Sequence, residues 1–249
     1  MVEIGRRGLL AGLAALGAGA CSRIADSETG RSIFDAAEGW HRAAHRALAS
    51  KQGLAPEYAP EDRSPSFRGN GSITVDSDFY RRELAGGFPD WRLTVGGLVE
   101  QPLALSLSDL RALPQRSQIT RHDCVEGWSA IGEWTGPQLG TLLDAAKLRE
   151  EANFIIFRCA DRLYGRPYYE SIDMVDAFHP QTIIAHALNG EPLPEKNGAP
   201  LRARIERQLG YKHAKYLTGI EAVASLGDIG AGKGGFWEDF AGYQWYAGI

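Results

Sequence analysis

The densest group of reactive side chains in the sequence is the segment from Arg121 to Ser129, which has Cys124 near its centre. Residues 118–125 have the pattern of a β-strand, which places the thiol near a strand end. A thiolate is a strong ligand for metals that accept soft sulfur donors. The positive charges of Arg121 and His122 would favour the thiolate form. The segment therefore predicts a metal-binding or reactive cysteine.

Glu126 follows Cys124 by two residues, so a continuing strand would turn both side chains to one face. A carboxyl group in that position could move a proton to or from a reacting oxygen. Three other interpretations of Cys124 stay open at this point. The cysteine could be buried and inert, it could form a nucleophile pair with His122, or it could form a disulfide with Cys159.

A second segment combines turn residues with basic residues. Asn197 begins a turn that leads into a strand carrying Arg202, and a glycine-containing loop then presents Lys212, His213 and Lys215. Backbone N–H groups together with arginine and lysine suit a phosphate-bearing ligand. A solvated basic loop is the alternative.

The two segments, Cys-Val-Glu-Gly-Trp-Ser at 124–129 and Asn-Gly-Ala-Pro-Leu-Arg at 197–202, occur in an order and spacing that resemble the sulfite-oxidase family. Within that family they are most similar to the catalytic subunits of bacterial periplasmic protein-methionine-sulfoxide reductases. The resemblance runs from Gly71 to the C-terminus. It implies an α+β fold with mixed β-sheets and short helices, and an oxidoreductase that binds Mo-molybdopterin.

The resemblance also implies roles for single residues. Cys124 would ligate molybdenum, and Glu126 would be an acidic catalytic residue close to the metal. Cofactor contacts are implied for Tyr80, Arg81, Cys124, Cys159, Asn197, Arg202, His213, Ala214 and Lys215. Cys159 stands where the reductases have a threonine, and the loop after it is shorter than theirs. These differences leave the substrate open.

Two-electron oxygen-atom transfer is the reaction that the resemblance implies, in the direction of reducing an S- or N-oxide that is either small or protein-bound. Sulfite oxidation is an alternative, for which Arg121, Arg202 and Lys215 could hold a dianion. A non-catalytic cofactor-binding domain is another. The electrons would be exchanged with a separate partner, for which a haem protein is the expected class.

Residues 1–25 have the pattern of a twin-arginine-type signal, because Arg6 and Arg7 precede an apolar run over 9–20. That run is too short to span a bilayer as a helix. Cys21 lies in a sequence that resembles a lipoprotein processing site, so it could carry a lipid anchor. We therefore expect an exported, periplasmic protein, either free or tethered to a membrane surface. An ordinary signal with two adjacent arginines is the alternative.

Composition and patterning complete the expected organisation. A net charge of −4 with no broad basic field argues against nucleic acid as a partner. Residues 26–70 should form a helix, over 31–50, and a Pro/Gly/Ser-rich linker, and residues 71–249 the oxidoreductase domain. The aromatic ending from 235 to 246 should pack over the core, with the rim of the substrate cleft as an alternative.

Short strands and helices alternate irregularly in the main domain, which favours an α+β fold over a doubly wound one. Capping patterns at Ser106–Asp109 and at Thr135–Gln138 each predict the start of a helix. The predicted strands are 91–95, 103–105, 118–125, 154–157, 168–172, 201–205 and 216–223, and the remaining helices are 139–148 and 174–178.

Overall fold

The computed structural model describes residues 27–48 and 53–249, which belong to two compact units. The first contains helix α2 (Glu28–Leu48), which confirms the helix predicted from the alanine-rich sequence. The second unit is Lys51–Ile249 and carries all the other elements that the described residues form. No helix within the described ranges is long and apolar enough to cross a membrane. The predicted signal segment and Cys21 lie outside the described residues.

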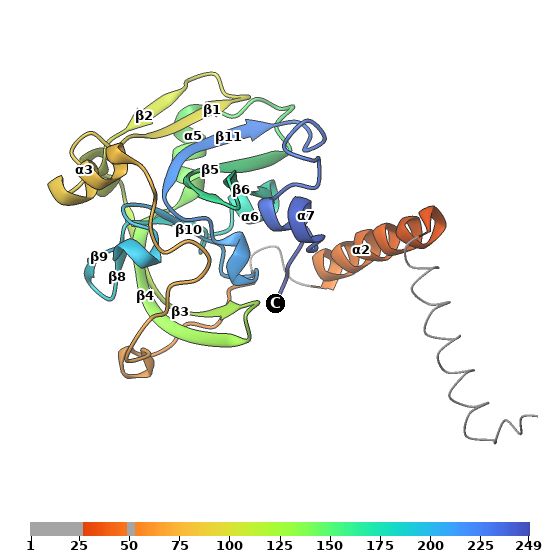
Figure 1. Ribbon diagram of the computed structural model, residues 1–249, viewed down its shortest axis with the longest axis horizontal. Coiled ribbons are helices and arrows are strands. Elements are labelled where there is room, and N and C mark those ends of the chain that lie inside the picture. The colour runs from red at the N-terminus through yellow and green to blue at the C-terminus, as the bar shows by residue number, and fades with distance from the viewer. Residues whose placement is uncertain (1–26, 49–52) are drawn as a thin grey trace, which may run out of the picture. The chain divides into compact units, whose positions relative to one another are not determined.

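The larger sheet of the second unit has five strands in the order β2–β1–β11–β5–β6 (Figure 1). Its central pair, β1 and β11, is parallel, and the other neighbours are antiparallel. This mixture confirms the predicted α+β class with mixed sheets. The strands are β1 (Leu93–Gly97), β2 (Leu103–Leu105), β5 (Phe154–Leu163), β6 (Arg166–Asp173) and β11 (Leu217–Val223).

A second sheet, in the order β3–β4–β8–β9, is built on a long hairpin in which Cys124 pairs with Trp128. Its strands are β3 (Gln115–Cys124), β4 (Trp128–Pro137), β8 (Ala187–Leu188) and β9 (Glu191–Pro192). Strands β7 (Ile183–Ala185) and β10 (Arg202–Arg204) form a separate antiparallel pair.

Strand β4 was not predicted, because glycine occupies two of its inward positions and hides the apolar alternation. A Cβ atom on Gly136 would lie 2.1 Å from the main-chain oxygen of Ile184. A Cβ atom on Gly132 would lie 2.9 Å from a methyl carbon of Leu188. Glycine therefore allows β4 to approach the strands beside it. The same glycines interrupt the apolar alternation by which a strand is predicted from sequence.

The helices of this unit are short: α3 (Asp78–Gly86), α4 (Leu107–Ala112), α5 (Leu139–Ala146), α6 (Met174–Ala177) and α7 (Phe236–Ala241). The predicted capping box is confirmed at Ser106, whose hydroxyl accepts the N–H of Asp109 at 3.1 Å. The capping pattern predicted at Thr135 is wrong. Thr135 lies within β4, and α5 begins after Gln138, whose side chain makes no capping bond.

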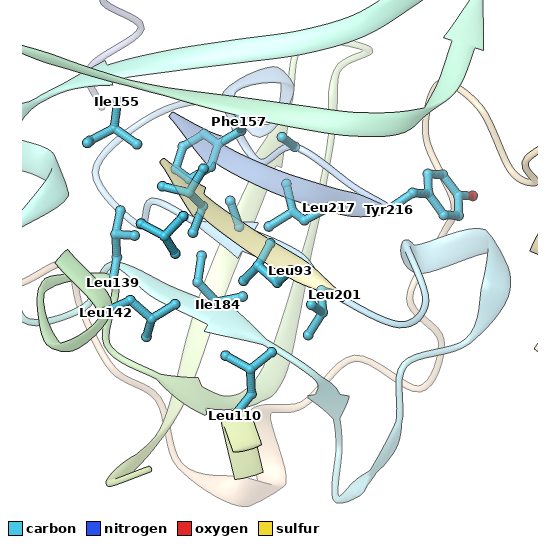
Figure 2. Close-up of a cluster of buried hydrophobic side chains, with 14 of the residues drawn as sticks. Leu93, Leu110, Leu139, Leu142, Ile155, Phe157, Ile184, Leu201, Tyr216 and Leu217 are labelled. Carbon is cyan, nitrogen blue, oxygen red and sulfur yellow. The ribbon is translucent and has the colours of Figure 1, made fainter. Parts of the chain in front are cut away.

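The main core lies between the five-stranded sheet, α5 and β7 (Figure 2). Leu93, Phe157 and Leu217 from the sheet are fully buried, as are Leu139 of α5 and Ile184 of β7. Burial of one such side chain stabilises the folded state by about 1.5–3 kcal/mol. The core therefore holds β10, the partner of β7, in a fixed position, and with it the two arginines of that strand.

The Pro/Gly/Ser-rich stretch before α3 runs along the β3–β4 hairpin. The N–H of Tyr58 donates to the carbonyl of Ile119, and that of Ser64 donates to the carbonyl of Ile131. Phe67 is buried in a smaller core cluster with Trp134. This stretch is therefore fixed to both strands of the hairpin before the chain reaches Asn70.

Candidate functional site

A pocket with about 680 Å³ of empty space, part of it open to solvent, lies at the end of the β3–β4 hairpin. It brings together four of the predicted site residues, Cys124, Glu126, His213 and Lys215. The other residues of its wall are Asn70, Gly71, Ser72, Val125, Asp161, Leu163, Tyr168, Gly210, Tyr211, Trp237 and Tyr243.

Cys124 is the last residue of β3 and is 7% exposed. The chain then turns through Gly127, which has a positive φ of 84°. The expectation that Glu126 continues the strand is therefore wrong, because the strand ends before it. The turn nevertheless places Glu126 in the pocket wall, where its Oε2 accepts a hydrogen bond from Nε1 of Trp128 at 2.9 Å.

The electrostatic environment of Cys124 differs from the predicted one. Arg121 is exposed and forms an ion pair with Asp123 at 2.9 Å. His122 is fully buried, and burial, together with Arg202 and Arg204, holds its pKa well below the usual value, so the ring is neutral. Burial raises the pKa of the Cys124 thiol. The protein therefore does not favour the thiolate form of Cys124 by itself. A bound metal ion would supply the positive charge, because coordination to a metal deprotonates a thiol.

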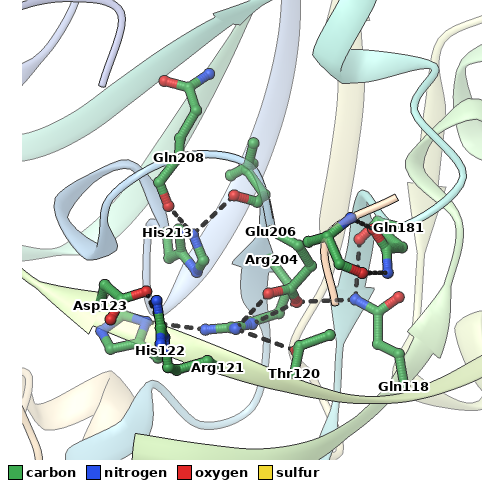
Figure 3. A network of polar contacts seen from close by, with 12 residues as sticks. Gln118, Thr120, Arg121, His122, Asp123, Gln181, Arg204, Glu206, Gln208 and His213 are labelled. Atoms are coloured by element: carbon green, nitrogen blue, oxygen red, sulfur yellow. Dashed lines mark hydrogen bonds and ion pairs between the residues drawn. The ribbon is translucent and has the colours of Figure 1, made fainter. Parts of the chain in front are cut away.

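His122 is already engaged on its own side of the hairpin. Nη1 of Arg204 lies 3.0 Å from its Nδ1, and its ring centroid lies 5.1 Å from that of His213 (Figure 3). No hydrogen bond joins His122 to Cys124 among the described residues, so the structure gives no support to a Cys–His nucleophile pair. The alternative of a disulfide is excluded as well, because Cys124 and Cys159 are both free thiols.

Arg204 was missed by the sequence analysis although it lies two residues after Arg202 in β10. Alternation along a strand turns both side chains to one face, which was the available signal. Arg204 is fully buried and pairs with Glu206 at 2.6 Å. Its guanidinium also lies over the ring of Trp134, 4.3 Å from the centroid. Arg204 therefore carries its own counterion.

Arg202 has no such counterion. It is fully buried, and its Nη1 donates to the main-chain oxygen of Asn197 at 3.3 Å, while Nε and Nη2 have no partner. Burial and the neighbouring Arg204 lower its pKa to about 9. The side-chain oxygen of Asn197 and Nδ1 of His213 are also buried without a partner. The free N–H groups of Arg202 fit negative charge on a ligand, whereas the oxygen of Asn197 and Nδ1 of His213 are acceptors that fit N–H or O–H donors of the same ligand.

Lys215 is the second buried cation without an ion-paired carboxylate in the described residues. Its ammonium donates to the main-chain oxygens of Asn70 and Ser72. Burial, followed by the charge of Arg202, lowers its pKa to about 7. An anionic group in the pocket would restore the charged form of Lys215. The donor set therefore fits the phosphate end of a pterin cofactor, and the thiol of Cys124 fits its metal.

The remaining predicted residues, like Asn197 and Arg202, do not belong to the pocket wall. Tyr80 is fully buried, and its hydroxyl donates to the main-chain oxygen of Ala199 at 2.9 Å. Arg81 is exposed and pairs with Asp76 and Asp78. Ala214 is buried between Lys215 and His213, and Cys159 is half-buried in β5, where burial raises the pKa of its thiol.

The aromatic ending serves both of the predicted purposes. Phe236 is buried in the main core, whereas Trp237 and Tyr243 line the pocket with their rings stacked at 5.5 Å. Asp161, Tyr168 and Tyr211 in the wall were missed, because single residues in two strands and a loop leave no local pattern. The pocket therefore has a cationic side and an aromatic side.

Comparison with known proteins gives the family. Residues 85–226 match the model of the oxidoreductase molybdopterin binding domain. The chain is 37% identical over 225 residues to the putative protein-methionine-sulfoxide reductase subunit YedZ1 of Azospira oryzae, covering 90% of this chain and 79% of the relative. It is 36% identical over 147 residues to the protein-methionine-sulfoxide reductase catalytic subunit MsrP of Xanthomonas axonopodis, covering 55% of this chain and 46% of that relative. The chain thus spans about half the length of MsrP.

A solved structure supports the fold. The sulfane dehydrogenase SoxCD from Paracoccus pantotrophus superposes with a TM-score of 0.52 at 19% identity, over 74% of this chain and 52% of that one. The matched sequence, the fold and the fit of the pocket agree with one another. The chain belongs to the molybdopterin-binding oxidoreductase family and is an oxidoreductase with a molybdopterin cofactor.

Proposed function

We propose that the chain reduces a sulfoxide, with molybdopterin held between Cys124 and the buried cations. The observation that carries this is the placement of the Cys124 thiol and Lys215 in one pocket wall, with the charge of the buried Arg202 acting on both. Cys124 would donate its sulfur to the metal. Arg202 and Lys215 would bind the anionic part of the cofactor, and His213 and Asn197 would accept hydrogen bonds from its donor groups. The bound cofactor supplies the two-electron redox chemistry.

The chain's own residues would bind and orient the substrate. The aromatic side of the pocket, with Trp237 and Tyr243, suits a thioether or sulfoxide, because sulfur packs favourably against aromatic rings. Glu126 lies in the same wall as Cys124, where its carboxyl group can pass a proton to the departing oxygen. These side chains position the sulfoxide oxygen and protonate it.

Sulfite oxidation is less well supported by the same geometry. A sulfite site needs several cations to hold a dianion, and Arg121 faces away from the pocket with Asp123 as its partner. The names of YedZ1 and MsrP refer to protein-methionine-sulfoxide reductases. We therefore propose methionine sulfoxide in a polypeptide as the substrate.

Export and an electron partner complete the proposal. The twin-arginine pattern at Arg6 and Arg7 supports export to the periplasm, with Cys21 as a site where a lipid could tether the chain. The names of both relatives describe subunits, which supports a separate protein that supplies electrons. A haem protein is the class we propose, because haem transfers single electrons.

Protein purified from its native host tests the proposal. We expect bound molybdenum and pterin, and reduction of methionine sulfoxide with a reduced dye as donor. Cys124→Ser should abolish this activity and leave the circular dichroism unchanged. Arg121→Gln, on the opposite face of β3, should retain activity. Full activity in folded Cys124→Ser protein would overturn the assignment of the ligand, and sulfite oxidation without sulfoxide reduction would reverse the proposed direction.

A further inference from the structure

A buried cluster of charges lies behind the pocket and plays no part in the proposal above. The ammonium of Lys212 lies 2.8 Å from a carboxylate oxygen of Glu170 and 2.5 Å from one of Glu238. All three side chains have no solvent exposure. They come from the 3₁₀ turn η3 (Gly210–Lys212), from β6 and from α7. One cation thus joins three segments that also line the pocket.

The two carboxyl groups lie close together, and neither Oε2 atom has a hydrogen-bond partner among the described residues. Both Oε2 atoms converge on Gly235, where a Cβ atom would meet that of Glu238 at 2.1 Å and that of Glu170 at 2.5 Å. Burial, together with the negative charge of Glu238, raises the pKa of Glu170 well above its usual value, and this outweighs the opposing effect of Lys212. Two carboxylates facing one ammonium would leave an uncompensated buried charge, which is costly. The cluster is neutral when the pair holds one proton.

Tyr168 connects this pair to the pocket. Its hydroxyl lies 3.3 Å from Oε1 of Glu170 and donates to the main-chain oxygen of Tyr211 at 2.8 Å. Tyr168 and Tyr211 both belong to the pocket wall that contains Cys124. Burial raises the pKa of Tyr168, and the neighbouring acidic groups Glu170, Glu238, Cys159 and Asp161 raise it further. The Tyr168 hydroxyl therefore joins the carboxyl pair to the wall of the site, and it can reach the pocket by turning away from the carbonyl of Tyr211.

We propose that the Glu170–Glu238 pair stores a proton and delivers it to the pocket through the hydroxyl of Tyr168. This rests on the proposed function, since reduction of a sulfoxide breaks the S–O bond and releases the oxygen as water. That reaction consumes two electrons, supplied by the haem-protein donor, and two protons. The pair provides one of these protons, and solvent provides the other.

The proton transfer balances within the cluster. The O–H bond of Glu170 breaks and its proton passes to the Tyr168 oxygen, while the Tyr168 hydroxyl turns from the carbonyl of Tyr211 and gives its own proton to the substrate oxygen in the pocket. Glu170 is left as a carboxylate beside Lys212, which stabilises it until a proton from solvent restores the acid before the next turnover. Tyr168 is neutral before and after the step.

Infrared spectroscopy of the holoenzyme tests the stored proton directly. Near neutral pH we expect the C=O stretching band of a protonated carboxylic acid, which shifts to lower frequency in deuterated water. The band should be lost in Glu170→Gln or Glu238→Gln. It should persist in Glu83→Gln, which changes a buried carboxylate of α3 outside the pocket wall. A wild-type enzyme without the band would overturn the proposal, whatever its substrate.

Steady-state kinetics test the delivery. Glu170→Gln and Tyr168→Phe should each lower kcat for sulfoxide reduction by about tenfold to hundredfold, in the range of general acid catalysis, with little change in KM. The fall in kcat of the wild type at high pH, as Glu170 loses its proton, should be absent in Glu170→Gln. A merely structural role would instead lower the molybdenum content or raise KM, and would leave the pH profile unchanged.

An unchanged kcat in both variants, with the infrared band present, would overturn delivery through Tyr168. If the wild type reduces no sulfoxide at all, the proposed function fails, and delivery to a sulfoxide fails with it. The infrared band distinguishes the two failures, because it reports the stored proton without any substrate.

Discussion

Gly210 lies so close to the imidazole of His122 that a Cβ atom on residue 210 would meet Cε1 and Nε2 of the ring at 2.5 Å. The ring has little room to move, because it is held by Arg204 and contacts Phe67 and Trp128. We expect Gly210→Ala to lower the free energy of unfolding by about 1–3 kcal/mol, the usual cost of overpacking. Urea denaturation of the purified variant measures this.

Gly96→Ala is the matched control, since a Cβ atom there would meet nothing within 4 Å. Its free energy of unfolding should lie within about 0.5 kcal/mol of the wild type. Equal destabilisation by both substitutions would show that the contact with His122 is not the cause.

Glu206 neutralises Arg204 in a fully buried pair and also accepts a hydrogen bond from Gln118 at 2.8 Å. Glu206→Gln removes the charge and leaves Arg204 buried without a counterion, which should cost about 3–5 kcal/mol of stability. Thermal unfolding followed by circular dichroism measures the loss. Asp76→Asn, which breaks the exposed pair with Arg81, should have no measurable effect, and a comparable loss there would contradict the explanation.

Lys215 makes the stability of the cofactor-free protein depend on pH. Its pKa falls from 10.5 in the unfolded chain to about 7 in the folded one, chiefly through burial. Between these values the unfolded chain binds the additional proton, so the free energy of unfolding rises as pH increases through this window. The slope from this one group is at most about 1.4 kcal/mol per pH unit.

Urea denaturation of the cofactor-free protein at several pH values tests this, with Lys215→Met as the comparison. In the variant, the free energy of unfolding should increase much less between pH 7 and pH 10.5 than it does in the wild type. Lys233→Met, which removes an exposed lysine, should keep it. A wild-type slope that is retained in Lys215→Met would assign the effect to another group.

The aromatic side of the pocket extends onto the surface. Tyr164 is 70% exposed and stacks on Phe240 with ring centroids 4.9 Å apart, and both contact Trp237 of the pocket wall. Exposed aromatic rings beside a site are strong contacts for a polypeptide. The double variant Tyr164→Ser/Phe240→Ser should raise KM for an oxidised polypeptide by about tenfold and leave KM for free methionine sulfoxide unchanged.

Phe178→Ser serves as the control, because Phe178 is similarly exposed and lies outside the pocket wall. It should leave both KM values unchanged. Parallel increases for the free and the polypeptide substrate in the double variant would place its effect on the pocket itself rather than on a docking surface.

Most strands and the position of Cys124 could be predicted, because local apolar patterns and capping residues specify them. Strand β4 could not, since Gly132 and Gly136 provide close packing instead of apolar alternation. The charge state of the site could not be predicted either. Arg121 and His122 precede the cysteine by three and two residues, but alternation along β3 turns Arg121 away and burial neutralises His122.

The sequence also could not predict which residues come together in the pocket wall. Asp161 and Tyr168 belong to strands of the large sheet, and their meeting with Cys124 depends on how two sheets pack, which no local pattern specifies. Arg202 and Lys215 were found because the motif that contains them is itself a sequence signal.

The pocket wall extends beyond the residues that match the family model on both sides. Asn70, Gly71 and Ser72 precede the matched region, and Trp237 and Tyr243 follow it. A fragment trimmed to residues 85–226 would keep Cys124 and lose the two carbonyl oxygens that hold Lys215. Two homologues that agree throughout the conserved region can therefore differ in cofactor retention and substrate choice through their flanking segments alone.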